Sequence, residues 1–146
     1  MFLMLPILPI WNRSSQPECS SPVSCSKRVL VVEDELIVGA IAAEALEEAG
    51  FTVLTAASAE EAEVILEREE VDVLFTDIDL GGRDGFDLAD KALEVQPGLS
   101  VVFASGRSRR CHESRIPAGA SFLSKPYRLS DMISEVDRAA RETSFQ

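Results

Sequence analysis

The stretch Val71-Asp72-Val73-Leu74-Phe75-Thr76-Asp77-Ile78-Asp79-Leu80-Gly81-Gly82 decides the fold, because an apolar run ends in it abruptly at carboxylates and glycines. The run is too short and too apolar for a surface helix, so it predicts a strand that is buried on both faces. Such a strand delivers Asp77 to the carboxyl edge of a parallel sheet, where ligands collect. Taken alone, Asp77 and Asp79 are explained equally well as turn-forming residues and as functional residues.

Composition limits the classes of protein that need to be considered. The chain has 146 residues, 46% of them hydrophobic, which is enough for one domain with a core of its own. Its formal net charge of −11 disfavours direct binding of nucleic acid, which requires a basic surface. Three cysteines and a single histidine do not suggest a disulfide framework or a zinc site, and they fit a reduced, cytoplasmic setting.

The first 26 residues differ in composition from the rest of the chain. Residues 2–11 are apolar but too few to span a bilayer, and no membrane association is expected. We interpret residues 1–26 as a disordered tail, or as the product of a start codon assigned too far upstream; a partner-docking peptide and a targeting signal are the alternatives. The folded domain is expected over residues 27–142, followed by a C-terminal tail at 143–146 and no output domain.

From Arg28 onward, strand and helix patterns alternate five times. This alternation predicts an α/β fold, a flavodoxin-like, doubly wound, five-stranded parallel sheet of strand order 2-1-3-4-5 with helices on both faces. The expected strands are 29–32, 51–56, 71–77, 99–104 and 121–124. The expected helices are 35–48, 58–69, 85–96, 107–115 and 130–141, of which 107–115 has no convincing apolar face.

Four of the five expected strands end in a polar residue. The ends are Glu33-Asp34, Asp77, Ser105 and Lys125. In the order 2-1-3-4-5 these four strands are neighbours, so the four ends converge on one pocket.

The residue types in this pocket indicate phosphoryl chemistry. Three carboxylates brought together repel one another unless a cation compensates, and ligands that are all oxygen favour Mg²⁺. Lys125 supplies a positive charge for a phosphate oxygen, and Ser105 supplies a hydroxyl donor. Asp77 is then the nucleophile, which accepts a phosphoryl group to form an acyl phosphate.

Four motifs together resemble the receiver domain of bacterial two-component response regulators, in a single-domain, stand-alone form. They are Val31-Val32-Glu33-Asp34-Glu35, Phe75-Thr76-Asp77 with Asp84-Gly85, Ala104-Ser105-Gly106, and the run from Gly119 to Tyr127. The resemblance implies that Asp77 is the phospho-acceptor and that Glu33, Asp34 and the backbone carbonyl of Asp79 join it in binding Mg²⁺. It also implies a phosphate-contacting Lys125 before a cis proline bond, a switch hydroxyl at Ser105 and a switch aromatic at Phe122.

Two features depart from the usual pattern of this family. Glu33 stands where an aspartate is commoner, which predicts altered affinity for the metal with binding retained. Leu80-Gly81-Gly82 replaces a frequent Met-Pro, and the two glycines predict a more flexible loop.

The resemblance implies a signalling switch and not an enzyme. The phosphoryl donor would be a sensor histidine kinase or a histidine phosphotransfer protein. The output would pass to a downstream effector protein through a face built from residues 107–115, 121–124 and 130–141. His112 is expected to be solvated, and arginines 107, 109, 110 and 115 form either a solvated face or a docking site for an acidic partner.

Two other functions compete with this interpretation. Asp77-Ile78-Asp79 is similar to the DxD strand end of haloacid-dehalogenase-like Mg²⁺-dependent phosphatases, although Gly81 stands where that family has Thr or Val. A phosphorylation-independent interaction module is the third possibility, and it would require a degraded pocket.

Overall fold

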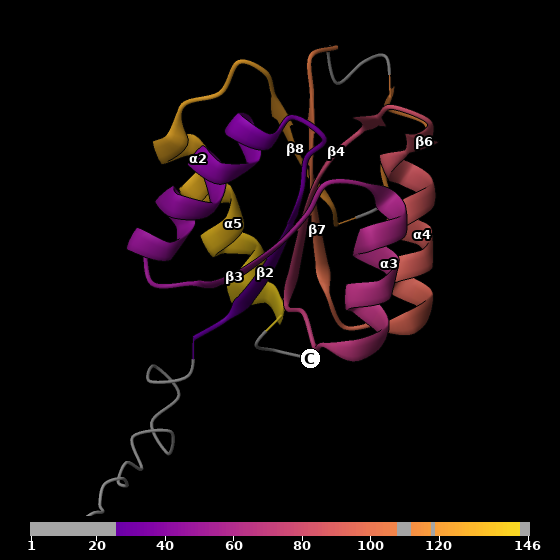
Figure 1. Cartoon of the computed structure of the whole chain (residues 1–146), viewed down its shortest axis with the longest axis horizontal. Coiled ribbons are helices and arrows are strands. Elements are labelled where there is room, and N and C mark those ends of the chain that lie inside the picture. The colour runs from indigo at the N-terminus through magenta and orange to yellow at the C-terminus, as the bar shows by residue number, and fades with distance from the viewer. Residues whose placement is uncertain (1–25, 108–111, 118, 144–146) are drawn as a thin grey trace, which may run out of the picture.

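The computed structural model describes residues 26–107, 112–117 and 119–143. The strands are β2 (Arg28–Val32), β3 (Thr52–Ala56), β4 (Val73–Asp77), β5 (Asp79–Leu80), β6 (Arg83–Asp84), β7 (Ser100–Ser105) and β8 (Ser121–Ser124). The helices are α2 (Leu36–Glu48), α3 (Ala59–Arg68), α4 (Gly85–Val95) and α5 (Leu129–Thr143) (Figure 1).

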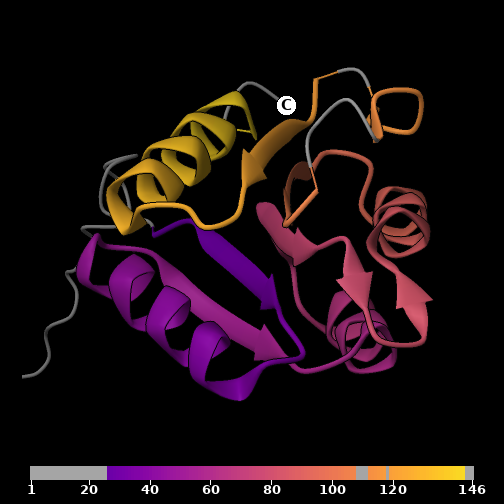
Figure 2. The ribbon, with the colours of Figure 1, turned by 90° about the horizontal axis from the view of Figure 1, so that it is seen from above.

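Five of the strands form one parallel sheet in the order β3-β2-β4-β7-β8. When these five strands are numbered from 1 to 5 in chain order, their order across the sheet is 2-1-3-4-5. The predicted topology is therefore confirmed. Helices α2 and α5 cover one face of the sheet, and α3 and α4 cover the other (Figure 2). The fold is therefore the doubly wound, flavodoxin-like sheet that the alternation of elements predicts.

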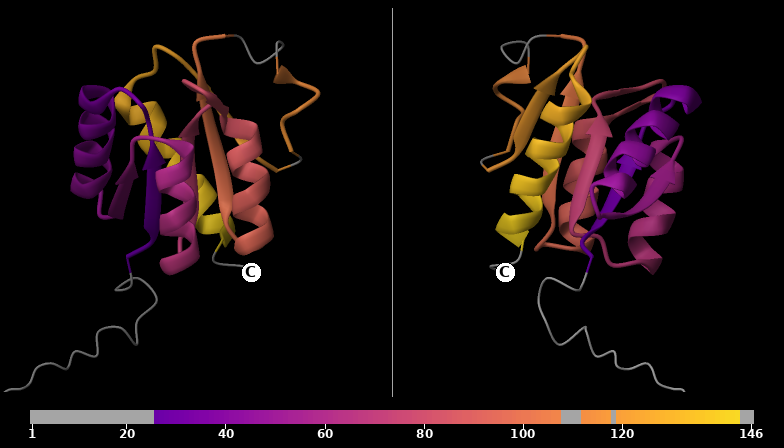
Figure 3. Two further views of the ribbon diagram at one scale, coloured as in Figure 1. Left: turned by 45° about the vertical axis from the view of Figure 1, so that its right-hand side comes forward. Right: turned by 90° about the vertical axis from the view of Figure 1, so that its left-hand side faces the viewer.

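The core lies in two apolar layers, one on each side of the sheet. Strand β4 is buried at every position, as expected of a central parallel strand with helices on both faces (Figure 3). On one side the core contains Leu30, Leu74 and Phe103, and on the other Val31, Phe75 and Val102. Alternate residues of each strand thus enter opposite layers, and this alternation fixes the register of the sheet.

Local sequence signals fix the ends of several elements. The Ser58 side chain caps α3 by accepting a hydrogen bond from the backbone N–H of Glu61 at 3.1 Å. Gly50 follows α2 with a φ of 107°, a conformation that glycine adopts without steric cost. On α5, Met132, Val136 and Ala140 are buried, as the helical spacing of these residues predicts.

The structure differs from the expectation in two segments. After Asp77 the chain forms a two-stranded antiparallel hairpin, β5–β6, which the sequence pattern does not predict. Of the helix expected at 107–115, residues 108–111 lie outside the described residues. The described part is one tight turn, in which the backbone N–H of Arg115 donates to the carbonyl of His112 at 2.8 Å.

Within the described ranges, no helix has the length and apolar character that crossing a membrane requires.

Gly85 allows β4 and α4 to lie close together. A Cβ atom at Gly85 would contact the carbonyl oxygen of Asp77 and would lie 2.9 Å from the Cα of Ile78. The backbone N–H of Gly85 also donates to the carbonyl of Ile78 at 2.7 Å. The absence of a side chain thus lets the start of α4 lie directly on the end of β4.

We expect Gly85→Ala to destabilise the protein by about 1–3 kcal/mol, because the added methyl group forces the backbone of α4 away from β4. Urea denaturation measures the free energy of unfolding. Gly82→Ala is the matched control, since a Cβ there meets no atom within 4 Å. Equal stability of the two variants would contradict this account of Gly85.

Candidate functional site

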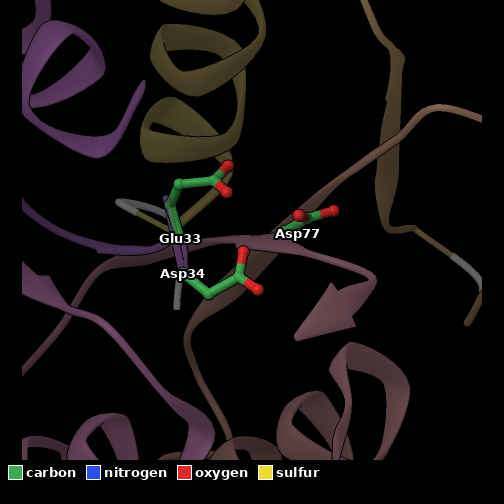
Figure 4. Close-up of side chains that lie close together, drawn as sticks. All are labelled: Glu33, Asp34 and Asp77. Carbon is green, nitrogen blue, oxygen red and sulfur yellow. The ribbon is translucent and has the colours of Figure 1, made fainter. Parts of the chain in front are cut away.

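Three carboxylates meet at the carboxyl edge of the sheet. Glu33 and Asp34 directly follow β2, Asp77 ends β4, and ligand oxygens of the three lie within 4.8 Å of one another (Figure 4). Pairing of Val32 with Thr76 in the parallel register brings Glu33 beside Asp77. Glu33 and Asp77 are 7% and 8% exposed. The convergence predicted for these three residues is therefore present.

Lys125 places its ammonium between two of these carboxylates. Its Nζ atom lies 3.2 Å from Oε1 of Glu33 and 3.1 Å from Oδ2 of Asp77. The backbone N–H of Lys125 donates to the carbonyl of Ser105 at 2.8 Å, and the Lys125–Pro126 bond is cis, as the resemblance implies. Lys125 thus joins the pocket from the edge strand β8.

Burial and charge change the protonation of this cluster. Burial is the largest cause that raises the pKa of Asp77, and the nearby charge of Asp34 adds to it, against the lowering effect of Lys125. Burial likewise raises the pKa of Glu33, with a contribution from Asp77. Burial lowers the pKa of Lys125, but its contacts with Asp77 and Glu33 outweigh burial and raise it overall. Glu33 and Asp77 therefore ionise less readily than ordinary carboxyl groups.

The donor set fits a hard divalent cation. All three side chains offer oxygen, the ligand atom that Mg²⁺ prefers, and these oxygens all lie within 4.8 Å of one another. Burial is the main cause of the raised pKa values of Glu33 and Asp77, and a neighbouring carboxylate adds to each, so a bound cation would favour their ionised forms. Glu33, Asp34 and Asp77 are thus suited to hold Mg²⁺.

The loop after Asp77 passes over the acidic cluster. The backbone N–H of Asp79 donates to Oδ1 of Asp77 at 3.4 Å, while the Asp79 side chain is exposed. Gly81 turns the hairpin with a φ of 70°, and a Cβ atom there would lie 3.7 Å from Oδ2 of Asp34. The metal-binding role of the Asp79 carbonyl stays a prediction.

Ser105 lies at the end of β7 and is fully buried. The register pairs Asp77 with Ala104, so Ser105 is one residue beyond the partner of Asp77. Its Oγ accepts the backbone N–H of Arg107 at 3.0 Å and lies 3.2 Å from Nε2 of His112.

The expectation that His112 is solvated was wrong. His112 is only 9% exposed, and its ring lies 5.5 Å from that of Phe86 and 6.1 Å from that of Phe122. The polar neighbours of His112 in the sequence suggested a surface position. Contacts with α4 and β8, which are distant in the sequence, bury it instead.

The described arginines of the basic cluster behave differently from one another. Arg107 is exposed, whereas Arg115 forms ion pairs with Asp84 and Asp87 and stacks its guanidinium 4.6 Å from the centre of the Phe86 ring. Arg109 and Arg110 lie outside the described residues. Arg115 therefore fastens its segment to α4.

Sequence reasoning missed an apolar groove beside Lys125. It has a volume of about 500 Å³, and its lining residues are Glu35, Val38, Ile41, Ala42, Lys125, Pro126, Tyr127 and Leu129. At the start of the same helix, Leu36 and Ile37 are 77% and 76% exposed. The signal was present in the sequence, because α2 begins with apolar residues on all sides and not on one stripe.

Comparison with known proteins identifies the family. Residues 29–137 match the response regulator receiver domain. The chain belongs to this family. A receiver domain is a signalling module of two-component systems, and this membership does not favour the haloacid-dehalogenase-like alternative. The interaction-module alternative required a degraded pocket, whereas Glu33, Asp34 and Asp77 are present and lie together.

Individual relatives differ in length. The response regulator receiver protein CpdR of Brucella abortus is 33% identical over 114 residues, which cover 77% of this chain and 95% of CpdR. The transcriptional regulatory protein PdtaR of Mycobacterium tuberculosis is 30% identical, with 84% of this chain and 61% of PdtaR covered. The chain spans only 14% of the sensor kinase CckA of Brucella abortus, at 33% identity over 88% of this chain.

Solved structures share the fold. The receiver domain of the hybrid histidine kinase CckA matches with a TM-score of 0.68 at 34% identity, covering 77% of this chain and 98% of that domain. A response regulator receiver protein from Sinorhizobium medicae matches with a TM-score of 0.76 at 26% identity, covering 81% and 97% of the two chains.

We expect the metal-free protein to lose stability as the pH rises from about 4 towards neutral. The loss begins near the ordinary pKa of a carboxyl group and ends above the raised pKa values that Asp77 and Glu33 have in the folded protein. The unfolded chain releases these protons at lower pH than the folded chain, so ionisation favours unfolding. Asp77→Asn removes one such group and should be more stable than the wild type at neutral pH, with the advantage shrinking in acid.

Urea denaturation in the presence of a chelator, repeated across this pH range, measures the difference. Asp90→Asn is the control, because Asp90 is an exposed carboxylate on α4. If metal-free Asp77→Asn is less stable than the wild type at neutral pH, the statement that the pKa of Asp77 is raised in the folded protein is refuted.

Proposed function

We propose that this receiver domain is a phosphoryl-accepting switch, which takes a phosphoryl group from a partner's phosphohistidine onto Asp77. The observation that carries the proposal is the ammonium of Lys125 between the carboxylates of Glu33 and Asp77, with Asp34 beside them. A nucleophile, an acidic metal site and a mobile positive charge are the parts that phosphoryl transfer to a carboxylate requires.

The step forms one bond and breaks another. An oxygen of the ionised Asp77 carboxylate attacks phosphorus as the phosphorus–nitrogen bond of the phosphohistidine breaks, and the imidazole leaves with the electron pair. The product is an acyl phosphate on Asp77. Lys125 is already within 3.1 Å of this carboxylate and stabilises the charge on the transferring oxygens.

Mg²⁺, held by Glu33, Asp34, Asp77 and the backbone carbonyl of Asp79, would neutralise the negative charge that the incoming phosphoryl group adds to the acidic cluster. Glu33 and Asp77 both contact Lys125, so they couple the charge at the metal site to the lysine.

The switch would act through Ser105 and Phe122. Phosphorylation draws the Ser105 hydroxyl towards the phosphate and lets the half-buried ring of Phe122 turn inward, which changes the surface offered to a downstream effector protein. Transfer onward to a histidine phosphotransfer protein and removal of phosphate from a kinase are both compatible with this chemistry. In either case the chain signals through protein contacts and not through turnover of a substrate.

We expect the protein to gain the mass of one phosphoryl group when incubated with Mg²⁺ and acetyl phosphate, because a small donor needs only the pocket. Intact-protein mass spectrometry detects the gain. It should disappear in Asp77→Asn and fall strongly when a chelator removes the metal. No mass gain in the wild type would overturn the proposed function.

The apolar groove beside Lys125 is the surface we assign to the phosphohistidine-bearing partner. It lies between α2 and the start of α5, and Ile37, which is 76% exposed, precedes the lining residue Ile41 by one turn of α2. A partner seated there would place its imidazole next to the lysine and Asp77. An exposed apolar patch of this kind is typical of a protein interface.

We expect Ile37→Asp to slow transfer from a phosphohistidine donor by about tenfold, because it places a charge in the apolar interface. Phosphorylation by acetyl phosphate should be unchanged. Val64→Asp is the matched control, because Val64 is 47% exposed on α3, across the sheet from α2. Two results would contradict the assignment of this groove to the partner. One is that Ile37→Asp and Val64→Asp slow transfer from the phosphohistidine donor equally; the other is that Ile37→Asp also slows phosphorylation by acetyl phosphate.

A further inference from the structure

His112 has a defined place that the proposed function does not yet use. It is the single histidine of the chain and is nearly buried, with Nε2 at 3.2 Å from the hydroxyl oxygen of Ser105. The ring also packs against Phe86 of α4 and Phe122 of β8. One side chain thus contacts the switch hydroxyl, the switch aromatic and the helix that follows the phosphoryl site.

The hydrogen-bonding capacity of Ser105 determines what this contact means. A hydroxyl has one hydrogen to donate and two lone pairs. One lone pair accepts the backbone N–H of Arg107 at 3.0 Å. Ser105 is fully buried, so its hydrogen needs an acceptor, and among the described residues Nε2 of His112 is the acceptor within reach.

We propose that His112 is a positioning residue, which holds the hydroxyl hydrogen of Ser105 in the unphosphorylated protein and must release it when Asp77 is phosphorylated. The inference rests on the proposed function. Ser105 can donate its hydrogen once, so a phosphoryl oxygen and Nε2 of His112 compete for it. His112 therefore opposes the phosphorylated state.

The same competition connects the hydroxyl to the surface. His112 begins the turn whose Arg115 pairs with Asp84, the residue that caps α4. Loss of the Ser105 contact frees the ring of His112, and with it one of the contacts that hold the turn against Phe86 and Phe122. Hydrogen-bond competition in the pocket is thereby transmitted to a turn at the protein surface.

The first test uses His112→Phe, which keeps an aromatic ring but has no acceptor. With Mg²⁺ and acetyl phosphate, we expect the ratio of phosphorylated to unphosphorylated protein to rise about fivefold, the worth of a typical hydrogen bond. In a Ser105→Ala background the same substitution should change nothing. The proposal would be overturned if His112→Phe left the ratio of phosphorylated to unphosphorylated protein unchanged. It would also be overturned if His112→Phe raised the ratio equally in the Ser105→Ala background, because packing and not the hydrogen bond would then explain the rise.

Two further variants sharpen the result. His112→Gln restores an acceptor at similar reach and should return the ratio to within about twofold of the wild type, since the hydrogen bond is regained. Glu113→Gln, an exposed neighbour in the same turn, should match the wild type. A glutamine variant that behaves like the phenylalanine variant, or a Glu113 variant that does so, would contradict the role of the acceptor.

A second measurement does not depend on phosphorylation. Long-range ¹⁵N–¹H correlation spectra of the imidazole report its tautomer, and the single histidine makes the assignment unambiguous. We expect a proton on Nδ1 and none on Nε2 in the unphosphorylated protein. A proton on Nε2 would overturn the inference and leave the proposed function intact, whereas a wild type that gains no phosphate would remove both.

Discussion

The contact of the Lys125 ammonium with the carboxylates of Glu33 and Asp77 is the interaction on which the site depends. Two carboxylates that are almost inaccessible to water, with a third beside them, would otherwise repel one another in a medium that screens charge poorly. Lys125 directly follows β8, at one edge of the sheet, and Glu33 follows β2, with β4 and β7 lying between these two strands. The sheet order is therefore what makes the charge balance possible, and a different order would separate these groups.

The same edge of the sheet joins chemistry to conformation. Asp77 ends β4, and Ser105 ends the neighbouring strand β7. The carbonyl of Ser105 accepts a hydrogen bond from the backbone N–H of Lys125. Gly85 lets α4 begin directly against Asp77. The start of α4 and the Ser105–His112 contact therefore both lie at the ends of these two neighbouring strands.

Much of the fold was predictable because its signals are local. The capping pair Ser58 and Glu61, the positive φ at Gly50 and the buried face of α5 each depend on residues within a few positions. The meeting of Glu33, Asp77 and Lys125 was also predictable, because the carboxyl ends of parallel strands lie along one edge of the sheet. The β5–β6 hairpin was not, since two paired residues on each side leave no periodicity to detect.

The sequence by itself determined the class of the fold, the strand order and the residue types at each strand end, because hydrophobic period and turn chemistry act over short distances. Only the tertiary structure decided the environment of His112, the ion pairs of Arg115 and the groove beside Lys125. These features depend on side chains from elements far apart in the chain, such as Phe86 and Phe122 around His112. Burial is a property of the assembled layers, and a polar neighbourhood in the sequence does not reveal it.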